Sequence, residues 1–212
     1  MRTKTFLAEE TPANETPAKK GLWKRALVGA AALLLALVIL IGGRIVWWIH
    51  VEHRWVTIRD AELYRSAAMP VDELRASIRE HGIRTVIDLR DVDLDLVEAE
   101  RSAMAQDGVR YVHIPSPLLP TDAIVDRFVD EVHGDGLPRP ILVHCKHGVG
   151  RSAVLSAVYE IEEHGATVAE ALARTSRLPD SLHFLSDWIP AFGQLRNAKG
   201  DYVRSYAPRH GR

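Results

Sequence analysis

The N-terminal quarter of the chain contains one long apolar stretch, and the remainder alternates short apolar runs with amphipathic ones. The 18 residues 26–43 (ALVGAAALLLALVILIGG) carry no charged side chain, and apolar residues continue after Arg44 to Ile49. At 1.5 Å per residue, a helix of about 18 residues is about 27 Å long, close to the roughly 30 Å of a bilayer core. The pattern predicts a transmembrane helix over 26–48, preceded by a polar tail over 1–25 that is typical of disorder.

Two other interpretations of this stretch stay open. A cleaved signal peptide has a shorter apolar core and a small-residue cleavage site, which Arg44 and the pair Trp47 and Trp48 fit poorly. A buried core helix is seldom so uniformly apolar. We therefore expect a membrane partner for this segment and a single-pass topology.

Basic residues flank the apolar stretch on both sides. Those before it are Lys19, Lys20, Lys24 and Arg25, and those after it are Arg44, Arg54 and Arg59. The small excess before the helix favours an N-terminus in the cytoplasm, because basic residues are retained on that side. The domain that follows would then lie on the extracytoplasmic side.

Beyond residue 52 the hydrophobic period switches repeatedly between that of a helix and that of a strand. Helical spacing of apolar residues predicts helices over 71–80, 95–106, 123–133, 151–163, 168–176 and 181–195. The last of these is broken or kinked by Pro190. Short apolar runs predict strands over 85–89, 109–114 and 141–144. The alternation predicts an α/β domain over 52–195 with a central, mainly parallel sheet flanked by helices. Residues 196–212 are predicted to be a basic, unpatterned tail.

Composition narrows the class of protein. A length of 212 residues with 47% hydrophobic residues allows one ordinary domain and a smaller part, and the formal net charge of −1 argues against a nucleic-acid partner. Asp91, Asp93 and Asp95 resemble the start of a calcium loop, but the glycine and glutamate that such a loop requires are missing. We therefore expect no metal and no other cofactor.

The single cysteine lies in a run of residues that suits an anion. The run is His144-Cys145-Lys146-His147-Gly148-Val149-Gly150-Arg151-Ser152, between a predicted strand and a predicted helix. A loop that enters a helix presents free amide groups and the positive end of the helix dipole. Gly148 and Gly150 let the backbone approach a ligand, and Arg151 can hold two of its oxygens at once. The run predicts a phosphate-binding loop.

The same positive field predicts a reactive thiol. It lowers the pKa of Cys145 into the range of activated thiols, so a thiolate would lie beneath the bound phosphate, placed for attack on phosphorus. Ser152 can donate a hydrogen bond to this sulfur, and His144 shapes the loop. The alternative is a buried structural cysteine, which leaves the spacing of glycine, arginine and serine unexplained.

The run resembles the signature loop of cysteine-dependent protein tyrosine and dual-specificity phosphatases, His-Cys-x-x-Gly-x-x-Arg-Ser/Thr. The matching residues are His144, Cys145, Gly148, Arg151 and Ser152. Weaker similarity to bacterial dual-specificity-type phosphatases covers most of 58–175. The resemblance implies a dual-specificity-phosphatase-like fold and catalysis through a phosphocysteine intermediate. It also implies substrate contacts from the loop residues His144, Lys146, His147, Gly148, Val149, Gly150 and Arg151.

The resemblance further implies an aspartate that protonates the leaving oxygen, on a loop before the signature. Asp122 is the candidate, although it lies closer to Cys145 than the family usually places this residue. Ser116 occupies the usual position and cannot do this chemistry. Alternatively, Asp122 is only a carboxylate at the start of the helix over 123–133.

Three functions stay open. The first is a phosphatase of phosphotyrosine in proteins, with or without phosphoserine and phosphothreonine. The second is a phosphatase of a phospholipid or phosphoinositide headgroup, which the positive charge of Lys146 and His147 and the membrane helix favour, unless Lys146 is only a solvated side chain. The third, an inactive phosphate-binding module, conflicts with the intact Cys145, Arg151 and Ser152.

Overall fold

The computed structural model describes residues 17–133, 136–175, 178–185, 195 and 197–209. The chain divides into two compact units, Met1–Arg44 and Ile45–Arg212. Most of the helix predicted over 181–195 lies outside the described residues, and near its start the structure has a short 3-10 helix, η1, at Asp180–Leu182.

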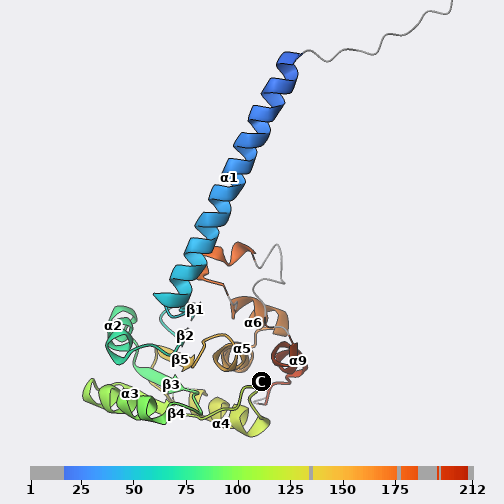
Figure 1. The fold of residues 1–212 in the computed structure, drawn as a ribbon. Helices are drawn as coiled ribbons and strands as arrows, with labels where there is room; N and C mark the ends of the chain where they lie inside the picture. Colours follow the sequence, from blue (N-terminus) through green and yellow to red (C-terminus); the bar gives the residue numbers. More distant parts are fainter. Residues whose placement is uncertain (1–16, 134–135, 176–177, 186–194, 196, 210–212) are drawn as a thin grey trace, which may run out of the picture. The chain divides into compact units, whose positions relative to one another are not determined.

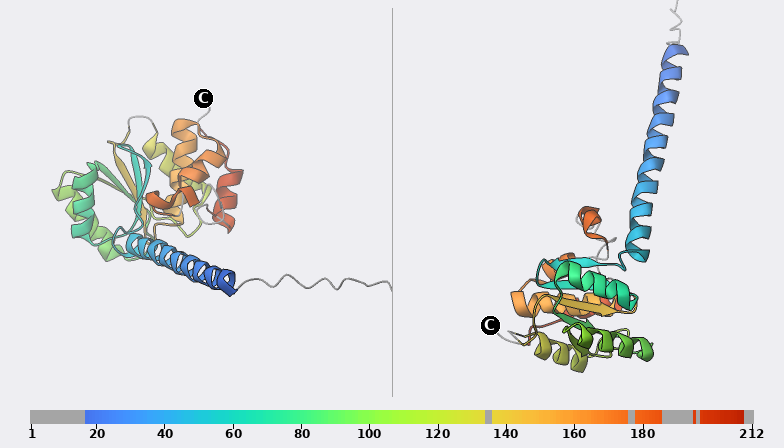
Figure 2. Two further views of the ribbon diagram at one scale, coloured as in Figure 1. Left: turned by 90° about the horizontal axis from the view of Figure 1, so that it is seen from above. Right: turned by 90° about the vertical axis from the view of Figure 1, so that its left-hand side faces the viewer.

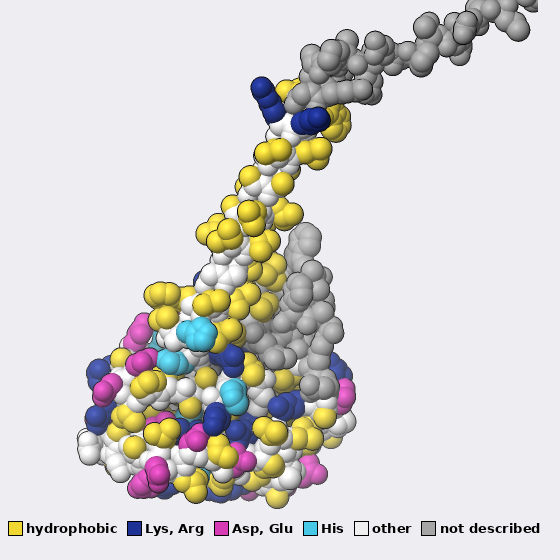
Figure 3. Space-filling view, viewed as in Figure 1, with side chains coloured by type: hydrophobic (Ala, Val, Ile, Leu, Met, Phe, Trp, Pro, Cys, Tyr) yellow, Lys and Arg dark blue, Asp and Glu magenta, His cyan; other side chains and the backbone are white. Residues whose placement is uncertain are grey.

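The N-terminal element is the long helix α1, Pro17–His50. Its section Leu22–His50, 29 residues, is long and apolar enough to cross a membrane. The large apolar side chains between Leu22 and Leu40 are exposed (Figure 3), whereas Trp48 near the end of the helix is buried. The helix begins earlier than predicted, since residues 17–25 are helical rather than part of a disordered tail. Proline is favoured at the first position of a helix and lysine is a good helix former, so these residues are compatible with helix despite their polarity.

The central sheet has five strands in the order β1-β2-β5-β3-β4 (Figure 1). The strands are β1 Val56–Arg59, β2 Leu63–Ala67, β3 Thr85–Asp88, β4 Arg110–His113 and β5 Ile141–Cys145. β1 pairs antiparallel with β2, and the other three pairs are parallel. The prediction of a mainly parallel sheet in an α/β domain is thus confirmed. β1 and β2 were not predicted. β2 is buried at all five positions yet includes Arg65 and Ser66, which interrupt any apolar run.

Helices cover both faces of the sheet (Figure 2). On one face lie α2, Val71–His81, and α3, Leu94–Gln106; on the other lie α4, Asp122–Val132, α5, Arg151–His164, α6, Val168–Arg174, and α9, Asn197–Ser205. Successive side chains of a strand point to opposite faces. Val143 and Cys145 of β5 therefore join the core beneath α4 and α5, whereas Leu142 joins the core beneath α2 and α3.

The C-terminal segment corrects a prediction. Residues 196–212 were expected to be an unpatterned tail, but Asn197–Ser205 forms α9, and Val203 is completely buried against α5 and α6. The helix has few apolar residues, so its period cannot be read from the sequence. Its stability comes from packing against neighbouring helices rather than from its own composition.

We expect Val203→Asp to lower the free energy of unfolding by about 3–5 kcal/mol, because the new carboxylate would be buried without a built partner. The matched control is Ala198→Asp, which places the same charge on an exposed position of α9 and should change stability by only about 0.5 kcal/mol. Urea unfolding of the full chain in detergent micelles, followed by tryptophan fluorescence, measures both. Equal effects would mean that α9 is not docked.

Candidate active site

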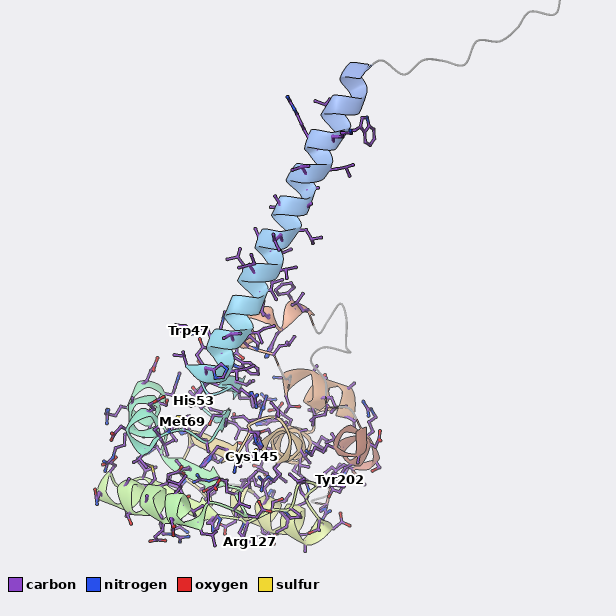
Figure 4. The ribbon with its side chains drawn as sticks, viewed as in Figure 1. Trp47, His53, Met69, Arg127, Cys145 and Tyr202 are labelled. Carbon is purple, nitrogen blue, oxygen red and sulfur yellow. The ribbon has the colours of Figure 1, made fainter. Side chains whose placement is uncertain are left out.

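The loop between β5 and α5 occupies the carboxyl end of the central strand. β5 is flanked on both sides by parallel strands, and ligand sites of such sheets lie at this edge. β5 ends at Cys145, whose side chain is labelled in Figure 4, and α5 begins at Arg151. Gly148 has φ 66°, and a Cβ atom there would lie 2.5 Å from the amide nitrogen of Ala67. Only glycine fits this turn, which confirms why the loop carries one at that position.

The thiol of Cys145 is buried and surrounded by hydrogen-bond donors. The amide of Gly148 donates to the sulfur over 3.3 Å, and the hydroxyl of Ser152 lies 3.4 Å from it. Burial disfavours the thiolate, but the Ser152 hydroxyl and the amides of Ser152, His147 and Gly148 outweigh it and lower the pKa of Cys145. The loop therefore favours the thiolate form of Cys145, and it brings Cys145 and Ser152 together as predicted.

The guanidinium of Arg151 is oriented by contacts that one of its nitrogen atoms, Nη1, makes with neighbouring oxygen atoms. Nη1 lies 2.9 Å from the carbonyl oxygen of Leu89, 2.7 Å from that of Ser116 and 2.5 Å from a carboxylate oxygen of Asp91. Among the described residues, every one of these contacts uses Nη1. Among these residues Nε and Nη2 make no such contact, so two parallel donors can serve a ligand with two acceptor oxygens. Asp91, which the sequence suggested only as part of a solvated loop, is thus a positioning residue for Arg151.

His144 points to the opposite face of the sheet and enters a buried cluster of charged groups. Arg90 Nη2 lies 2.7 Å from carboxylate oxygens of both Asp88 and Glu100, and His144 Nε2 lies 3.3 Å from Glu100. The hydroxyl of Tyr111 donates to Asp88 over 2.6 Å. Burial opposes a charge on the imidazole, but Asp88 and Glu100 outweigh it and raise the pKa of His144. The two carboxylates thereby favour the protonated form of an imidazole that is the neighbour of Cys145 in β5.

The same cluster has the donor atoms of a metal site. Asp88, Glu100 and His144 each offer one ligand atom, all within 4.8 Å of one another. However, Arg90 already pairs with both carboxylates, and its charge balances them as a metal ion would. We therefore interpret the group as an ion-pair cluster. Its members come from β3, α3 and β5, and nothing in their sequence spacing indicates that they meet.

Asp122 is placed away from the thiol. It is the first residue of α4, and its carboxylate accepts hydrogen bonds of 2.9 Å from Tyr202 and from Arg209. Its side chain is 78% exposed and lines a cavity of ≈ 600 Å³ together with Tyr202, Tyr206 and Arg209. Among the described residues that line the Cys145 cavity, Asp122 is absent. The structure does not bring Asp122 together with the other predicted catalytic residues.

The cavity over Cys145 has a volume of ≈ 310 Å³. Its lining residues are Arg54, Leu118, Cys145, His147, Val149, Gly150, Arg151 and Lys199. Lys146, expected to face the substrate, instead forms an ion pair of 3.0 Å with Asp93. Arg54 and Lys199 were not predicted, because one precedes the first strand and the other lies in the supposed tail.

Known proteins resemble this chain over the same region. A family model described as "DSP-PTPase phosphatase fused to NAD+ Kinase" matches residues 49–186. The human "Dual specificity protein phosphatase CDC14C" is 33% identical over 95 residues, which cover 45% of this chain and 20% of that protein. "Dual specificity protein phosphatase TpbA" of Pseudomonas aeruginosa (strain UCBPP-PA14) is 28% identical over 116 residues, which cover 54% of this chain and 50% of that protein. The chain thus spans half or less of the length of these curated relatives.

A solved structure shows the same fold. The core catalytic domain of the PP-IP phosphatase SIW14 from S. cerevisiae superimposes with a TM-score of 0.54 at 13% identity, covering 73% of this chain and 85% of that one. Because the family model matches more than half of the chain, the protein belongs to the dual-specificity type of the protein tyrosine phosphatase family. The resemblance drawn from the signature loop is confirmed, and family and fold are those of cysteine-based phosphatases.

We expect Ser152→Ala to move the pH midpoint of Cys145 alkylation upward, because it removes a hydrogen bond that favours the thiolate. The thiolate exists above the thiol's pKa, so alkylation near neutral pH should slow in the variant. Iodoacetamide reaction followed by mass spectrometry measures this directly, since the chain has 1 cysteine. Ser156→Ala, one turn further along α5 and also buried, is the matched control. A shared midpoint for both variants would show that Ser152 does not stabilise the thiolate.

Proposed function

We propose that the protein hydrolyses phosphoric monoesters through a phosphocysteine intermediate. The observation that carries the proposal is the buried Cys145 thiol, which lies under loop amides beside Arg151, whose contacts with described residues all use Nη1. The thiolate sulfur attacks phosphorus, the bond from phosphorus to the ester oxygen breaks, and that oxygen takes up a proton. Water then cleaves the phosphorus–sulfur bond, releasing inorganic phosphate and restoring the thiolate.

The loop residues have distinct parts in these steps. Arg151 and the amides of 146–151 hold the equatorial oxygens, whose negative charge they stabilise in the transition state. The Ser152 hydroxyl stabilises the sulfur when it leaves as a thiolate. When protonated, the imidazole of His144 contributes a positive charge from the opposite face of β5. This sequence of steps needs no metal.

For the substrate, the first candidate is a phosphorylated protein, with phosphotyrosine or with several phosphorylated residue types. The names of CDC14C and TpbA, both called dual specificity protein phosphatases, support it. The second candidate is the headgroup of a phospholipid or phosphoinositide. The cavity favours it, because Arg54 and Lys199 line it in addition to Arg151. An inactive phosphate-binding module is disfavoured by the intact thiol, arginine and serine.

We propose further that α1 anchors the protein as a single membrane span with the N-terminus in the cytoplasm. The length of the apolar section supports a span, and the basic residues before it, among them Lys24 and Arg25, support this direction. The catalytic unit would then act on the extracytoplasmic side.

For the proton donor, Asp122 stays the candidate that the sequence indicates. It heads α4, directly after the loop whose Ser116 carbonyl contacts Arg151. In the described arrangement its carboxylate is bound by Tyr202 and Arg209, so it must leave these contacts to reach the leaving oxygen.

We expect Cys145→Ser to abolish phosphate release while substrate affinity is retained, because the serine keeps the loop geometry but is a far weaker nucleophile. Phosphate release and equilibrium binding of a phosphotyrosine peptide would be measured with the full chain in detergent micelles. Acid quench of the wild-type reaction should trap phosphate on Cys145. Turnover by the serine variant would refute the mechanism, and an unchanged unfolding midpoint shows that the variant is folded.

We expect Asp122→Asn to slow hydrolysis of alkyl phosphates by about 10²–10⁴-fold and to spare aryl esters whose leaving groups need no proton. Asp91→Asn should slow both ester types by the same factor, because Asp91 acts through Arg151 rather than on the leaving group. Hydrolysis rates measured for a series of esters whose leaving groups differ in pKa distinguish the Asp122 variant from the Asp91 variant. An Asp122 variant with wild-type rates would remove this residue from the role, and leaving-group dependence at Asp91 would transfer it there.

A further inference from the structure

The rim of the Cys145 cavity carries more positive charge than one phosphate requires. The scissile phosphate already has Arg151, the loop amides and the start of α5. Arg54 and Lys199 add two further cationic side chains from parts of the chain outside the signature loop. Among the described residues that line this cavity, none is acidic. A cavity lined by one sign of charge concentrates oppositely charged ligands.

Arg54 is held at the rim by a constrained backbone. His53 and Arg54 both have left-handed conformations, with φ 48° and 54°, which are unfavourable for residues other than glycine. The amide of Arg54 donates to the carbonyl of Trp48 over 2.8 Å, and the carbonyl of His53 accepts from Ala67 over 2.7 Å. Such strain persists only where the surroundings enforce it, and it is concentrated at functional positions.

The guanidinium of Arg54 is directed at the signature loop. Its Nη1 donates to the carbonyl oxygen of His147 over 2.7 Å. Among the described residues, no carboxylate pairs with Arg54. Lys146, in contrast, lies within the loop but is neutralised by Asp93 at 3.0 Å. Arg54, which lies outside the signature loop, is therefore the cation that can bind a second anionic group.

Lys199 reaches the other side of the rim from α9. A Cβ atom at Gly150 would lie 2.6 Å from the Lys199 ammonium nitrogen. The absence of a side chain at Gly150 thus lets this ammonium group lie against the residue that precedes α5. Val203 docks α9 through the core, so the position of Lys199 depends on tertiary packing rather than on chance exposure.

We propose that Arg54 and Lys199 form a second anion subsite, which selects small headgroups that carry another phosphate close to the scissile one. The ≈ 310 Å³ cavity suits a small polyphosphorylated headgroup, whether soluble or attached to a lipid. This inference rests on the proposed phosphatase activity, whose substrate class it specifies. Neither residue performs the chemistry; both act on which phosphomonoester is bound.

The experiment compares inositol bisphosphate with inositol monophosphate in two measurements. kcat/KM is measured with the full chain in detergent micelles, and Kd is measured by calorimetry in the Cys145→Ser background, which needs no turnover. The variants are Arg54→Gln, Lys199→Gln and the double variant. The matched control is Arg79→Gln, which removes the same charge from an exposed position of α2.

We expect the wild-type protein to prefer the bisphosphate by about 100-fold, and each single variant to reduce this preference about tenfold, since each removes one charge-assisted contact. The double variant should lose the preference, and Arg79→Gln should keep it. A lipid carrying the same bisphosphate headgroup in vesicles shows the source of the ligand: faster turnover than with the soluble headgroup assigns it to the membrane, and equal turnover assigns it to solution.

The outcomes separate this inference from the proposed activity. The subsite would be overturned, and the phosphatase activity would stand, if phosphate is released with equal kcat/KM from both inositol phosphates. The same conclusion would follow if the variants lower kcat/KM equally for both compounds. Absence of phosphate release with a preserved bisphosphate preference in Kd would overturn the activity and leave the subsite standing. Preference for a phosphotyrosine peptide over both inositol phosphates would also overturn the subsite.

Discussion

The close approach of Gly148 to the backbone of β2 is the contact on which the rest of the site depends. A Cβ atom there would lie 2.5 Å from the Ala67 amide nitrogen, so any other residue would push the loop away from the sheet. With the loop in place, the Gly148 amide points at the Cys145 sulfur, and the Cys145 carbonyl accepts from Ala68. These contacts hold Cys145 and the amide that donates to its sulfur against the end of β2.

Charge around Cys145 is arranged in two layers, because adjacent residues of β5 face opposite sides of the sheet. On one side, Cys145 faces amides and Arg151. On the other, His144 lies with Arg90 between two carboxylates, a combination whose formal charges cancel when the imidazole is protonated. Burying these charges is tolerable only because each has an opposite partner. Protonation of His144, which the two carboxylates favour, therefore leaves no net charge in this cluster.

The surroundings of the cavity come from distant parts of the catalytic unit. Arg54 lies just after α1, and Lys199 lies on α9, near the other end of the chain. A family with a shared signature loop can therefore differ in specificity through segments outside it. Here those segments place two cationic side chains at the rim of the Cys145 cavity, so α9 contributes to the surroundings of the site as well as to the core.

The signature loop, the long apolar helix and the alternation of strands and helices could be predicted from sequence, because each depends on local spacing: Cys145 to Arg151, an apolar stretch, and a period. Sequence did not predict strand β2, helix α9 or the cluster of Asp88, Arg90 and Glu100. Their polar residues are stabilised by partners that are distant in the chain. The positions of Arg54 and Lys199 at the cavity could not be predicted either, because sequence spacing does not show which distant residues meet. The contact of Asp122 with Arg209 could not be predicted for the same reason. The sequence by itself determined the chemistry of the loop; tertiary packing alone decided which charges surround it.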